Sequence, residues 1–576
     1  MAFVRKVKVK NDKGGYDEYV RIVESYREGG KVKQRIISHL GNVKTLKKDI
    51  HRIVNGLLRA VDEHGLVDPA TGEKCKAKEY GTKYVVGHLW EELEFSNIYK
   101  PVDIRGGKEA VPYEKYIRMM VVNKLSDPES KLGIFRWLTK VWWPDSGFPE
   151  ELHNESLQPE EQKELAQKEV MKLYRAMDEM IEKKEDLERH IYHKLRDLFS
   201  IKVDIIFYDL TSSYFEGRGP EGLATLGYSR DNEPGKTQIV IGVIMCNGFP
   251  IGHEVFEGNR VDKKTVKEIL NKIKGQYKIH RCIFVGDRGL ISKENLNELE
   301  QGKEFDSILA LKKRRNNEVK RILMGDHPLI FHREKEDMEW VEVTGEDNVR
   351  YIVVRNPEIA EEQKRLREGH IKGLDEQLRS LQEKVNRQKR ISIKNTTEKA
   401  AEILRHHHGR RYFAYSFDKK DKKIKYWIKG ESLRLEESLD GIYILRTKEP
   451  NLSSLETIKN YKDLMDVERS FRVMKDILDL RPFRHRKDIR VRAHVLICFI
   501  ALLFSKIMER YLKMKKINLS APMAWESLKN MQITEIEFQG DKYQYLTELT
   551  YYQKIILKAL KIRLPSRLTI ADKKQV

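Results

Sequence analysis

Cysteine is scarce in this sequence, and no two cysteines lie close together. Only four of 576 residues are cysteines: Cys75, Cys246, Cys282 and Cys498. No pair has the C-x-x-C spacing that marks many zinc and redox sites. The sequence therefore argues against structural zinc and favours a reducing compartment.

Long apolar segments are also lacking. The longest, residues 495–504, is well short of the roughly 20 residues that cross a bilayer, so it predicts a core helix. Lysine and arginine occur early in the chain without an apolar segment behind them, and we expect no export signal.

Positive charge is abundant. Lysine and arginine number 110 against 89 aspartates and glutamates, which gives a net charge of +21 and a pI near 9.4. This surplus favours a polyanionic partner. Hydrophobic residues make up 40% of the chain, enough for ordered cores, and the length predicts two to four domains.

The first 200 residues show two patterns. Three short β-type segments separated by glycine pairs predict a small antiparallel sheet within residues 1–43. Residues 44–200 carry apolar side chains at three- and four-residue spacing, which predicts a helical domain. Both regions are rich in basic residues, which suits either DNA contact or a solvated surface. The expected helices are 50–60, 84–93, 113–125, 132–142 and 170–199.

Residues 205–213 read I-I-F-Y-D-L-T-S-S, a buried-strand pattern interrupted by Asp209. Burying an ionised carboxylate is costly unless it is hydrogen-bonded, paired or bound to a metal. Two interpretations stay open. Asp209 caps a turn that begins at Thr211, or it is a metal ligand whose partner acids lie elsewhere in the chain.

The elements around Asp209 follow the order of an RNase H-like α/β fold with a mixed sheet. Three strands form a meander, closed by the hairpin signal Asn247-Gly248, and a helix, a strand, a helix and a strand follow. The expected strands are 205–213, 238–245, 251–256, 282–285 and 307–311. In such a fold, acids that leave the first and fourth strands lie side by side. Asp209 and Asp287 have these two positions.

The expected core has two parts, residues 201–330 and 441–515. Residues 331–440 form an insertion domain with strands on both sides of a charged helix, and this helix predicts a helical hairpin or a short coiled coil. A helical C-terminal region is expected over residues 516–576.

A helix expected over residues 461–478 supplies a third acid. Its apolar residues repeat at three and four positions. Tyr461, Glu468 and Lys475 are seven residues apart, so they share a second stripe at the border of the core. Glu468 can thereby approach the two aspartates, while Tyr461 and Lys475 reach a phosphodiester. A surface glutamate among basic neighbours is the common alternative.

Three such acids favour phosphodiester chemistry with metal ions. Two Mg²⁺ ions about 3.5 to 4 Å apart supply a nucleophile, orient the substrate and neutralise charge. Carboxylate oxygens suit Mg²⁺, and Mn²⁺ can replace it. We predict that Asp209, Asp287 and Glu468 bind two such ions.

These residues resemble a known family. Asp209 in Y-D-L-T-S, Asp287 in G-D-R-G and Tyr461-x2-Leu464-x3-Glu468-x6-Lys475 are similar to the DDE transposases of bacterial and archaeal insertion sequences, in the group with a Tyr-x2-Arg-x3-Glu-x6-Lys motif. The resemblance covers about residues 200–510 and includes G-Y-S-R-D at 227–231. The chain departs from the motif at Leu464, where the family has arginine.

The resemblance implies a DNA transposase. Its metal-bound acids cut the ends of the element and then activate the released 3′-hydroxyl to attack target DNA, with a hairpin intermediate as one possible route. It also implies that the first 200 residues bind terminal inverted repeats, that a homodimer assembles on double-stranded DNA, and that the enzyme works at the prokaryotic nucleoid in the cytoplasm. The alternatives are a structure-specific nuclease with the same fold and an inactive DNA-binding derivative of a mobile element.

Several residues are candidates for contacts with DNA. Arg472 lies near the Glu468 stripe and is a candidate replacement for the missing arginine. The resemblance also implies that an aromatic residue of the insertion domain stacks on a base flipped out of the transposon end. Trp340 and Trp427 are the candidates, although a tryptophan in such a strand is more often a core residue. His406-His407-His408 indicates a basic turn rather than a metal site, because adjacent side chains do not face one point. The full set of candidates is Tyr461, Arg472, Lys475, Arg288, Lys312, Lys313 and Trp340.

Overall fold

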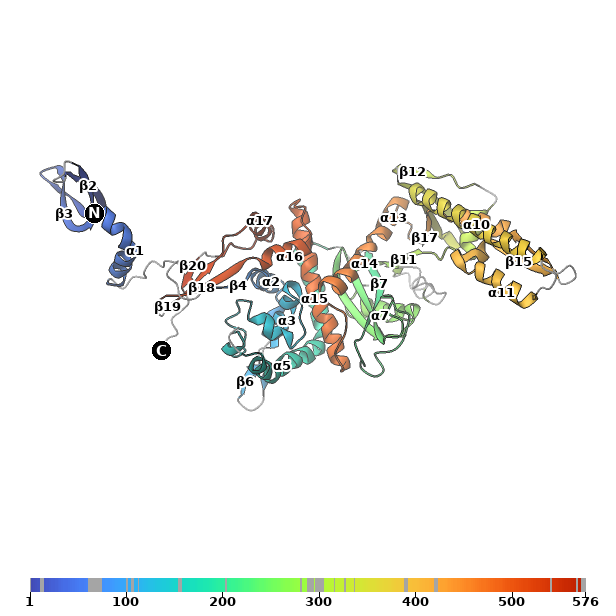
Figure 1. The fold of residues 1–576 in the computed structure, drawn as a ribbon, viewed down its shortest axis with the longest axis horizontal. Helices are drawn as coiled ribbons and strands as arrows, with labels where there is room; N and C mark the ends of the chain where they lie inside the picture. The colour runs from blue at the N-terminus through green and yellow to red at the C-terminus, as the bar shows by residue number, and fades with distance from the viewer. Residues whose placement is uncertain are drawn as a thin grey trace. The chain divides into compact units, whose positions relative to one another are not determined.

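The structure is a computed structural model. It describes residues 2–10, 15–60, 75–99, 102–104, 108–111, 113–153, 158–201, 205–279, 282–286, 295, 305–314, 316–325, 328–335, 337–387, 392–418, 423–538, 541–565 and 568–570. The chain divides into two compact units, drawn in Figure 1. The smaller unit comprises residues 1–79, 531–549 and 564–576, and the larger comprises residues 80–530 and 550–563.

The smaller unit begins with the predicted antiparallel sheet. Strands β1 (Ala2–Lys10), β2 (Tyr16–Glu28) and β3 (Lys31–Asn42) pair in chain order. Helix α1 (Val43–Ala60) follows. The basic side chains of β1 are exposed, as either a DNA-facing or a solvated sheet requires.

A second sheet in this unit corrects the prediction of a helical C-terminal region over residues 516–576. Besides helices α16 (Ala521–Lys529) and α17 (Tyr551–Ala559), that region contains three strands. Their partner is β4 (Cys75–Glu79), which pairs with β18. A pairing between strands so far apart in the sequence leaves no signal in local periodicity. The C-terminal strands are β18 (Gln532–Phe538), β19 (Asp541–Leu546) and β20 (Leu568–Ile570).

The helical region of the larger unit surrounds one long buried helix, α15 (Asp488–Met514), which packs on α3 and α5. Helix α15 is long and apolar enough to cross a membrane, but 89% of its apolar window is buried inside the protein, so it is the core helix that residues 495–504 predict. The predicted helix 170–199 is two helices, because Lys183 leaves the helical conformation. The other elements are α2 (Gly81–Glu92), β5 (Val102–Ile104), β6 (Lys108–Val111), α3 (Tyr113–Ser126), α4 (Gly133–Leu138), α5 (Pro159–Glu182) and α6 (Lys184–Phe199).

In the described part of the chain, the central sheet has nine strands in the order β12-β13-β14-β17-β11-β10-β7-β8-β9. Its last five strands confirm the RNase H-like fold. Strands β7, β8 and β9 form an antiparallel meander, and β10 and β11 continue the sheet parallel to β7. Helix α7 (Val266–Gly275) connects β9 to β10. The five strands are β7 (Ile205–Tyr214), β8 (Gln238–Cys246), β9 (Phe249–Glu257), β10 (Cys282–Gly286) and β11 (Phe305–Ala310).

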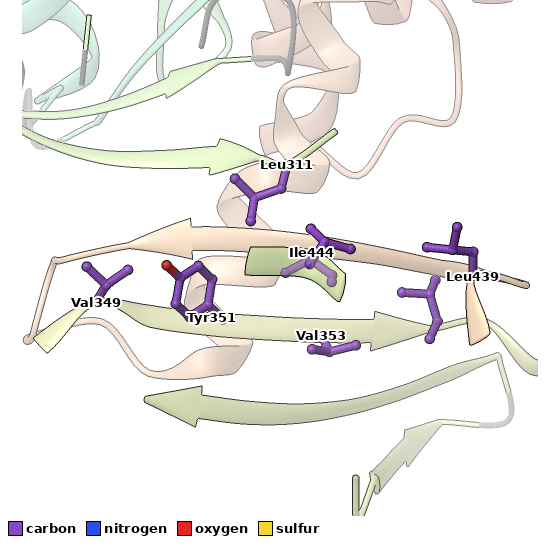
Figure 2. Packing of buried hydrophobic residues seen from close by; sticks show 8 residues of the cluster. Leu311, Val349, Tyr351, Val353, Leu439 and Ile444 are labelled. Carbon is purple, nitrogen blue, oxygen red and sulfur yellow. The ribbon is translucent and has the colours of Figure 1, made fainter. Parts of the chain in front are cut away.

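The strands predicted for the start of the insertion continue this sheet instead of standing apart from it. β17 (Ile442–Thr447) pairs on one side with β11 and on the other with β14, so it has no unpaired edge there. Figure 2 shows Leu311, Val353 and Ile444 packed in the core that these strands share. The added strands are β12 (His332–Lys335), β13 (Met338–Thr344) and β14 (Arg350–Arg355).

The rest of the insertion contains the predicted helical hairpin. Leu374 and Leu378 of the long helix α10 pack on Phe413, which begins β15. Helix α10 also lies along α11 and β16. The elements are α10 (Pro357–Arg387), α11 (Ile393–Ile403), β15 (Phe413–Asp418), β16 (Lys423–Ile428) and α12 (Gly430–Ser438).

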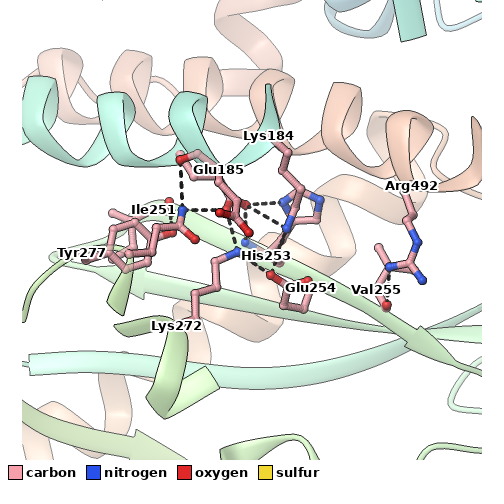
Figure 3. Close-up of polar contacts among 11 residues, drawn as sticks. Lys184, Glu185, Ile251, His253, Glu254, Val255, Lys272, Tyr277 and Arg492 are labelled. Atoms are coloured by element: carbon pink, nitrogen blue, oxygen red, sulfur yellow. Dashed lines mark hydrogen bonds and ion pairs between the residues drawn. The ribbon is translucent and has the colours of Figure 1, made fainter. Parts of the chain in front are cut away.

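A buried group of charged side chains joins helix α6 to the edge strand β9 and helix α7 (Figure 3). We call it the Glu188 cluster: Glu188, Lys184, His253, Glu254 and Lys272. Glu188 and Lys272 approach to 2.6 Å, and Lys184 and Lys272 lie 2.9 and 2.5 Å from Glu254. The backbone N–H of His253 donates to Glu188 at 2.9 Å. Because an unpaired buried charge is costly, moving α6 away from the sheet would leave these charges without their partners.

Candidate active site

A cleft of about 610 Å³ lies where strand β7 meets helix α14 (Met465–Arg472). Two of the three predicted acids, Asp209 and Glu468, line it together. Two predicted cations, Arg472 and Lys475, line it as well. The remaining charged residues of its wall are Arg230, Asp231, Asp476 and Arg481.

Asp209 reaches the cleft because of its place in strand β7. Tyr208 and Leu210 on either side of it are buried, whereas Asp209 is half-buried and lines the cleft. β7 continues to Tyr214, so Thr211 begins no turn and the capping interpretation of Asp209 is wrong.

The parallel register of β7 and β10 places the end of β10 beside the middle of β7. Gly286, the last residue of β10, is the partner of Tyr208, the residue before Asp209. The next residue in the chain is Asp287. Asp287 and Arg288 lie outside the described residues.

The segment predicted as one helix over 461–478 is three consecutive helical pieces. A capping box between Ser453 and Glu456 starts α13 (Ser454–Asp463), α14 follows, and Val473–Ile477 forms a π-helical turn. The predicted apolar stripe is confirmed as buried. Its members are Leu464, Val467, Phe471, Met474 and Leu478.

This packing explains which side chains of the segment face the cleft. Helix α14 lies against β7 through its buried stripe, and Glu468 and Arg472 are exposed on its flank. Leu464, which stands where the motif has arginine, is a core residue that is 5% exposed and offers no charge. Arg472 therefore supplies a cation to the cleft from one turn after Glu468.

Lys475 and Arg481 both bind a residue that the sequence analysis did not select. Lys475 Nζ and Arg481 Nη1 each donate to Asp231 Oδ1 at 2.7 Å. Burial lowers the pKa of Lys475, and the charge of Asp231 partly offsets this. Asp231 closes the G-Y-S-R-D segment, so its sequence context was a signal, but its partner is 244 residues away.

The backbone before Asp231 is anchored to the core. The N–H of Arg230 donates to Ser212 Oγ of β7 at 2.8 Å, and its guanidinium donates to Asp262 at 2.5 Å. Arg230 therefore fixes the point at which the chain enters the cleft.

Two family models match the sequence. Residues 4–70 match the IS1634 family transposase N-terminal domain, and residues 204–504 match the transposase DDE domain, which is more than half of the chain. The chain belongs to the DDE transposase family. The motif group expected from Tyr461, Glu468 and Lys475 is consistent with the IS1634 match. A comparison with curated proteins found no match.

The carboxylate donors of the transposase fit a hard divalent cation. Asp209 and Glu468 offer oxygen ligands, which suit Mg²⁺ or Mn²⁺ better than softer metals. Within the described part of the chain, no three His, Cys, Asp or Glu side chains form a metal-binding group. The third predicted ligand, Asp287, is outside that part.

Other predicted DNA contacts of the transposase lie away from the cleft. The ring of Tyr461, at the end of α13, is 5.7 Å from that of Tyr443 on β17, so the shared stripe with Glu468 does not bring Tyr461 to the cleft wall. Lys313 lines a different cavity, beside Arg314, whose guanidinium pairs with Glu436. Lys312 is exposed after the end of β11.

The structure also shows where the two candidate tryptophans and the three consecutive histidines lie. Trp340 is half-buried within β13, with its ring 5.1 Å from that of His332, so it is part of the sheet. Trp427 on β16 is 50% exposed. His407 stacks on His370 with ring centroids 4.0 Å apart, in a basic turn as expected.

Proposed function

We propose that the transposase cuts the ends of an insertion sequence and joins them to target DNA with the help of two divalent metal ions. One observation carries this proposal. Asp209 of a central strand and Glu468 of a much later helix line one cleft, as the DDE arrangement requires. The end of β10 beside Tyr208 supports Asp287 as the third acid.

The acids and cations of the cleft have different roles. Asp209, Glu468 and Asp287 would hold Mg²⁺ or Mn²⁺, which when bound supplies an activated nucleophile and stabilises charge on the reacting phosphate. Arg472 is exposed at the cleft and binds and orients the DNA backbone. Lys475 binds a phosphate next to the one that reacts, because its ammonium is a compact positive charge on the same wall.

The remaining regions select the DNA. The exposed basic residues of β1 and the helical region of residues 44–200 recognise the terminal inverted repeats, and two copies of the chain pair two ends. The net charge of +21 supports a large DNA contact.

The test compares Asp209→Ala, Asp287→Ala and Asp466→Ala on labelled inverted-repeat DNA. Asp466 is on helix α14 but pairs with Arg469, so it serves as the control. We expect the first two variants to lose Mg²⁺-dependent cutting and joining while they still bind the ends. Metal-dependent cutting by Asp209→Ala contradicts the proposal.

The same assay separates the two alternatives. A wild-type protein that cuts but never joins two ends is a structure-specific nuclease. A wild-type protein that binds ends and leaves nicking at background throughout a Mn²⁺ titration is an inactive DNA-binding derivative.

A further inference from the structure

The positive wall of the cleft is already bound to a carboxylate of the protein. The Asp231 side chain is only 4% exposed, and its Oδ1 accepts from both Lys475 and Arg481 at 2.7 Å. Its Oδ2 is buried and accepts no hydrogen bond from the described residues. Asp231 is thus held mainly by two cations, through one oxygen.

Lys475 and Arg481 surround the Asp231 carboxylate in the way that two cations surround a bound anion. A lysine and an arginine that converge on one oxygen also bind a phosphate oxygen, with similar lengths and charge. Lys475 lines the same cleft as Asp209 and Glu468. A backbone phosphate of DNA in the cleft and the Asp231 carboxylate therefore compete for the same two cations.

We propose that Asp231 is an internal substitute for a DNA phosphate, which occupies Lys475 and Arg481 until the backbone of the element's end displaces it. This inference rests on the proposed function. Asp231 is a positioning residue, because it acts on the reaction through the two cations. A DNA that makes few other contacts cannot displace the carboxylate, so Asp231 weakens binding of unrelated DNA more than binding of the true ends.

The surrounding backbone allows this exchange. Arg230 is fixed to β7 and to Asp262. Beyond Asp231, residues 232–237 have neither helix nor strand, and Asn232 has a positive φ of 56°. Rotation of the Asp231 side chain can move the carboxylate away from the cations without breaking the sheet.

The test uses Asp231→Asn in the full chain, with Asp466→Asn as the control for net charge. Binding of an inverted-repeat duplex and of an unrelated duplex of equal length is measured without divalent metal at several salt concentrations. We expect Asp231→Asn to bind unrelated DNA about tenfold tighter, the size of one charge-assisted hydrogen bond. The slope of log affinity against log salt becomes steeper by about 0.9 for each phosphate gained. The Asp466 side chain is half-exposed and pairs with Arg469 outside the cleft wall, so its variant stays within about twofold of wild type.

Two results overturn the inference. One is that Asp231→Asn binds unrelated DNA as tightly as wild type does. The other is that a folded Asp231→Asn binds it more weakly, which would mean that Asp231 orients the two cations for DNA. A second measurement on the wild-type chain applies if the variant does not fold. Carbodiimide labelling of Asp231, read by mass spectrometry, rises when end DNA is added if the carboxylate is displaced. Labelling that stays low contradicts displacement.

These binding measurements are independent of catalysis. If Asp209→Ala still cuts DNA, the proposed function fails whatever Asp231 does. If Asp209→Ala is inactive and Asp231→Asn binds like wild type, only the role of Asp231 fails.

Discussion

The larger unit contains two groups of lysines and carboxylates that differ in their surroundings. In the Glu188 cluster, the side chains of Glu188 and His253 are fully buried and that of Lys272 is 9% exposed. In the cleft, Glu468 and Arg472 are exposed, and only the Asp231–Lys475 pair is buried to a similar degree. Both groups contain the residue types of an active site.

The comparison shows that a dense group of charges does not by itself identify a catalytic site. Burial alone raises the pKa of Glu188, but Lys184 and Lys272 reverse this and hold it well below its usual value. The carboxylates and lysines of that cluster pair with one another and join three elements. In the cleft, the exposed Glu468 and the half-buried Asp209 line one cavity beside the end of β10. Accessibility and position in the sheet separate the two groups.

The largest effect is expected from Glu468→Gln. We expect the rate of end cleavage to fall at least about a thousandfold, or ~4 kcal/mol of barrier, because one carboxylate of the proposed metal site is lost. Glu468 is exposed, so the melting temperature stays close to that of wild type. Single-turnover cleavage and thermal unfolding measure the two quantities. If Glu468→Gln cleaves at a rate within tenfold of wild type, Glu468 is not a residue of the active site.

The opposite outcome is expected in the other cluster. Glu188→Ala removes the fully buried carboxylate of the cluster, so Lys184 and Lys272 keep only Glu254 of its two acids, and we expect the free energy of unfolding to fall by about 3 to 5 kcal/mol. Urea unfolding measures this loss. Glu185→Gln on the exposed side of α6 is the control, and cleavage per folded molecule should stay unchanged. If Glu188→Ala is as stable as Glu185→Gln, the cluster does not hold α6 to the sheet.

Local patterns predict the elements of the core and two residues of the candidate site. The run around Asp209 has strand periodicity, and the stripe of Val467, Phe471 and Met474 has helix periodicity, so each pattern assigns a side chain to a face. The order of strands then limits the topology to an RNase H-like sheet. Asp209 and Glu468 follow from these two steps.

Partners across long distances in the chain could not be predicted in this way. Periodicity shows which face of an element is buried, but not which element covers it. The pairing of β4 with β18, the extension of the sheet by β12–β14 and the contact between Asp231 and Lys475 all depend on such partners. In the sequence, Glu188 looks like an ordinary polar residue on an amphipathic helix. Its burial could not be predicted, because it depends on contacts with His253 and Lys272 from distant parts of the chain.

A smaller effect should appear in the pH dependence of stability. The pKa of His253 is lowered from 6.5, mainly by burial, so the unfolded chain binds a proton below about pH 6.5 before the folded chain does. The pKa of Glu188 is lowered well below 4.5, so the unfolded chain again binds a proton first below about pH 4.5. Stability therefore falls as pH falls through both windows, by about 1.36 kcal/mol for each unit of difference. Urea midpoints at a series of pH values measure this. In Glu188→Ala, stability should no longer fall as the pH drops below 4.5. If it still falls as in wild type, other carboxyl groups cause the pH dependence.

The smallest effect separates two arginines of helix α14. Arg472 lines the cleft, whereas Arg469 pairs with Asp466 at 3.1 Å and is 67% exposed. We expect Arg472→Ala to weaken end binding severalfold and to make the slope of log affinity against log salt shallower by about 0.9, because one phosphate contact is lost. Arg469→Ala removes the same charge from the same helix and should leave both quantities unchanged. Equal effects of the two substitutions indicate that DNA responds only to the net charge of α14, and that Arg472 does not replace the motif arginine that is absent at Leu464.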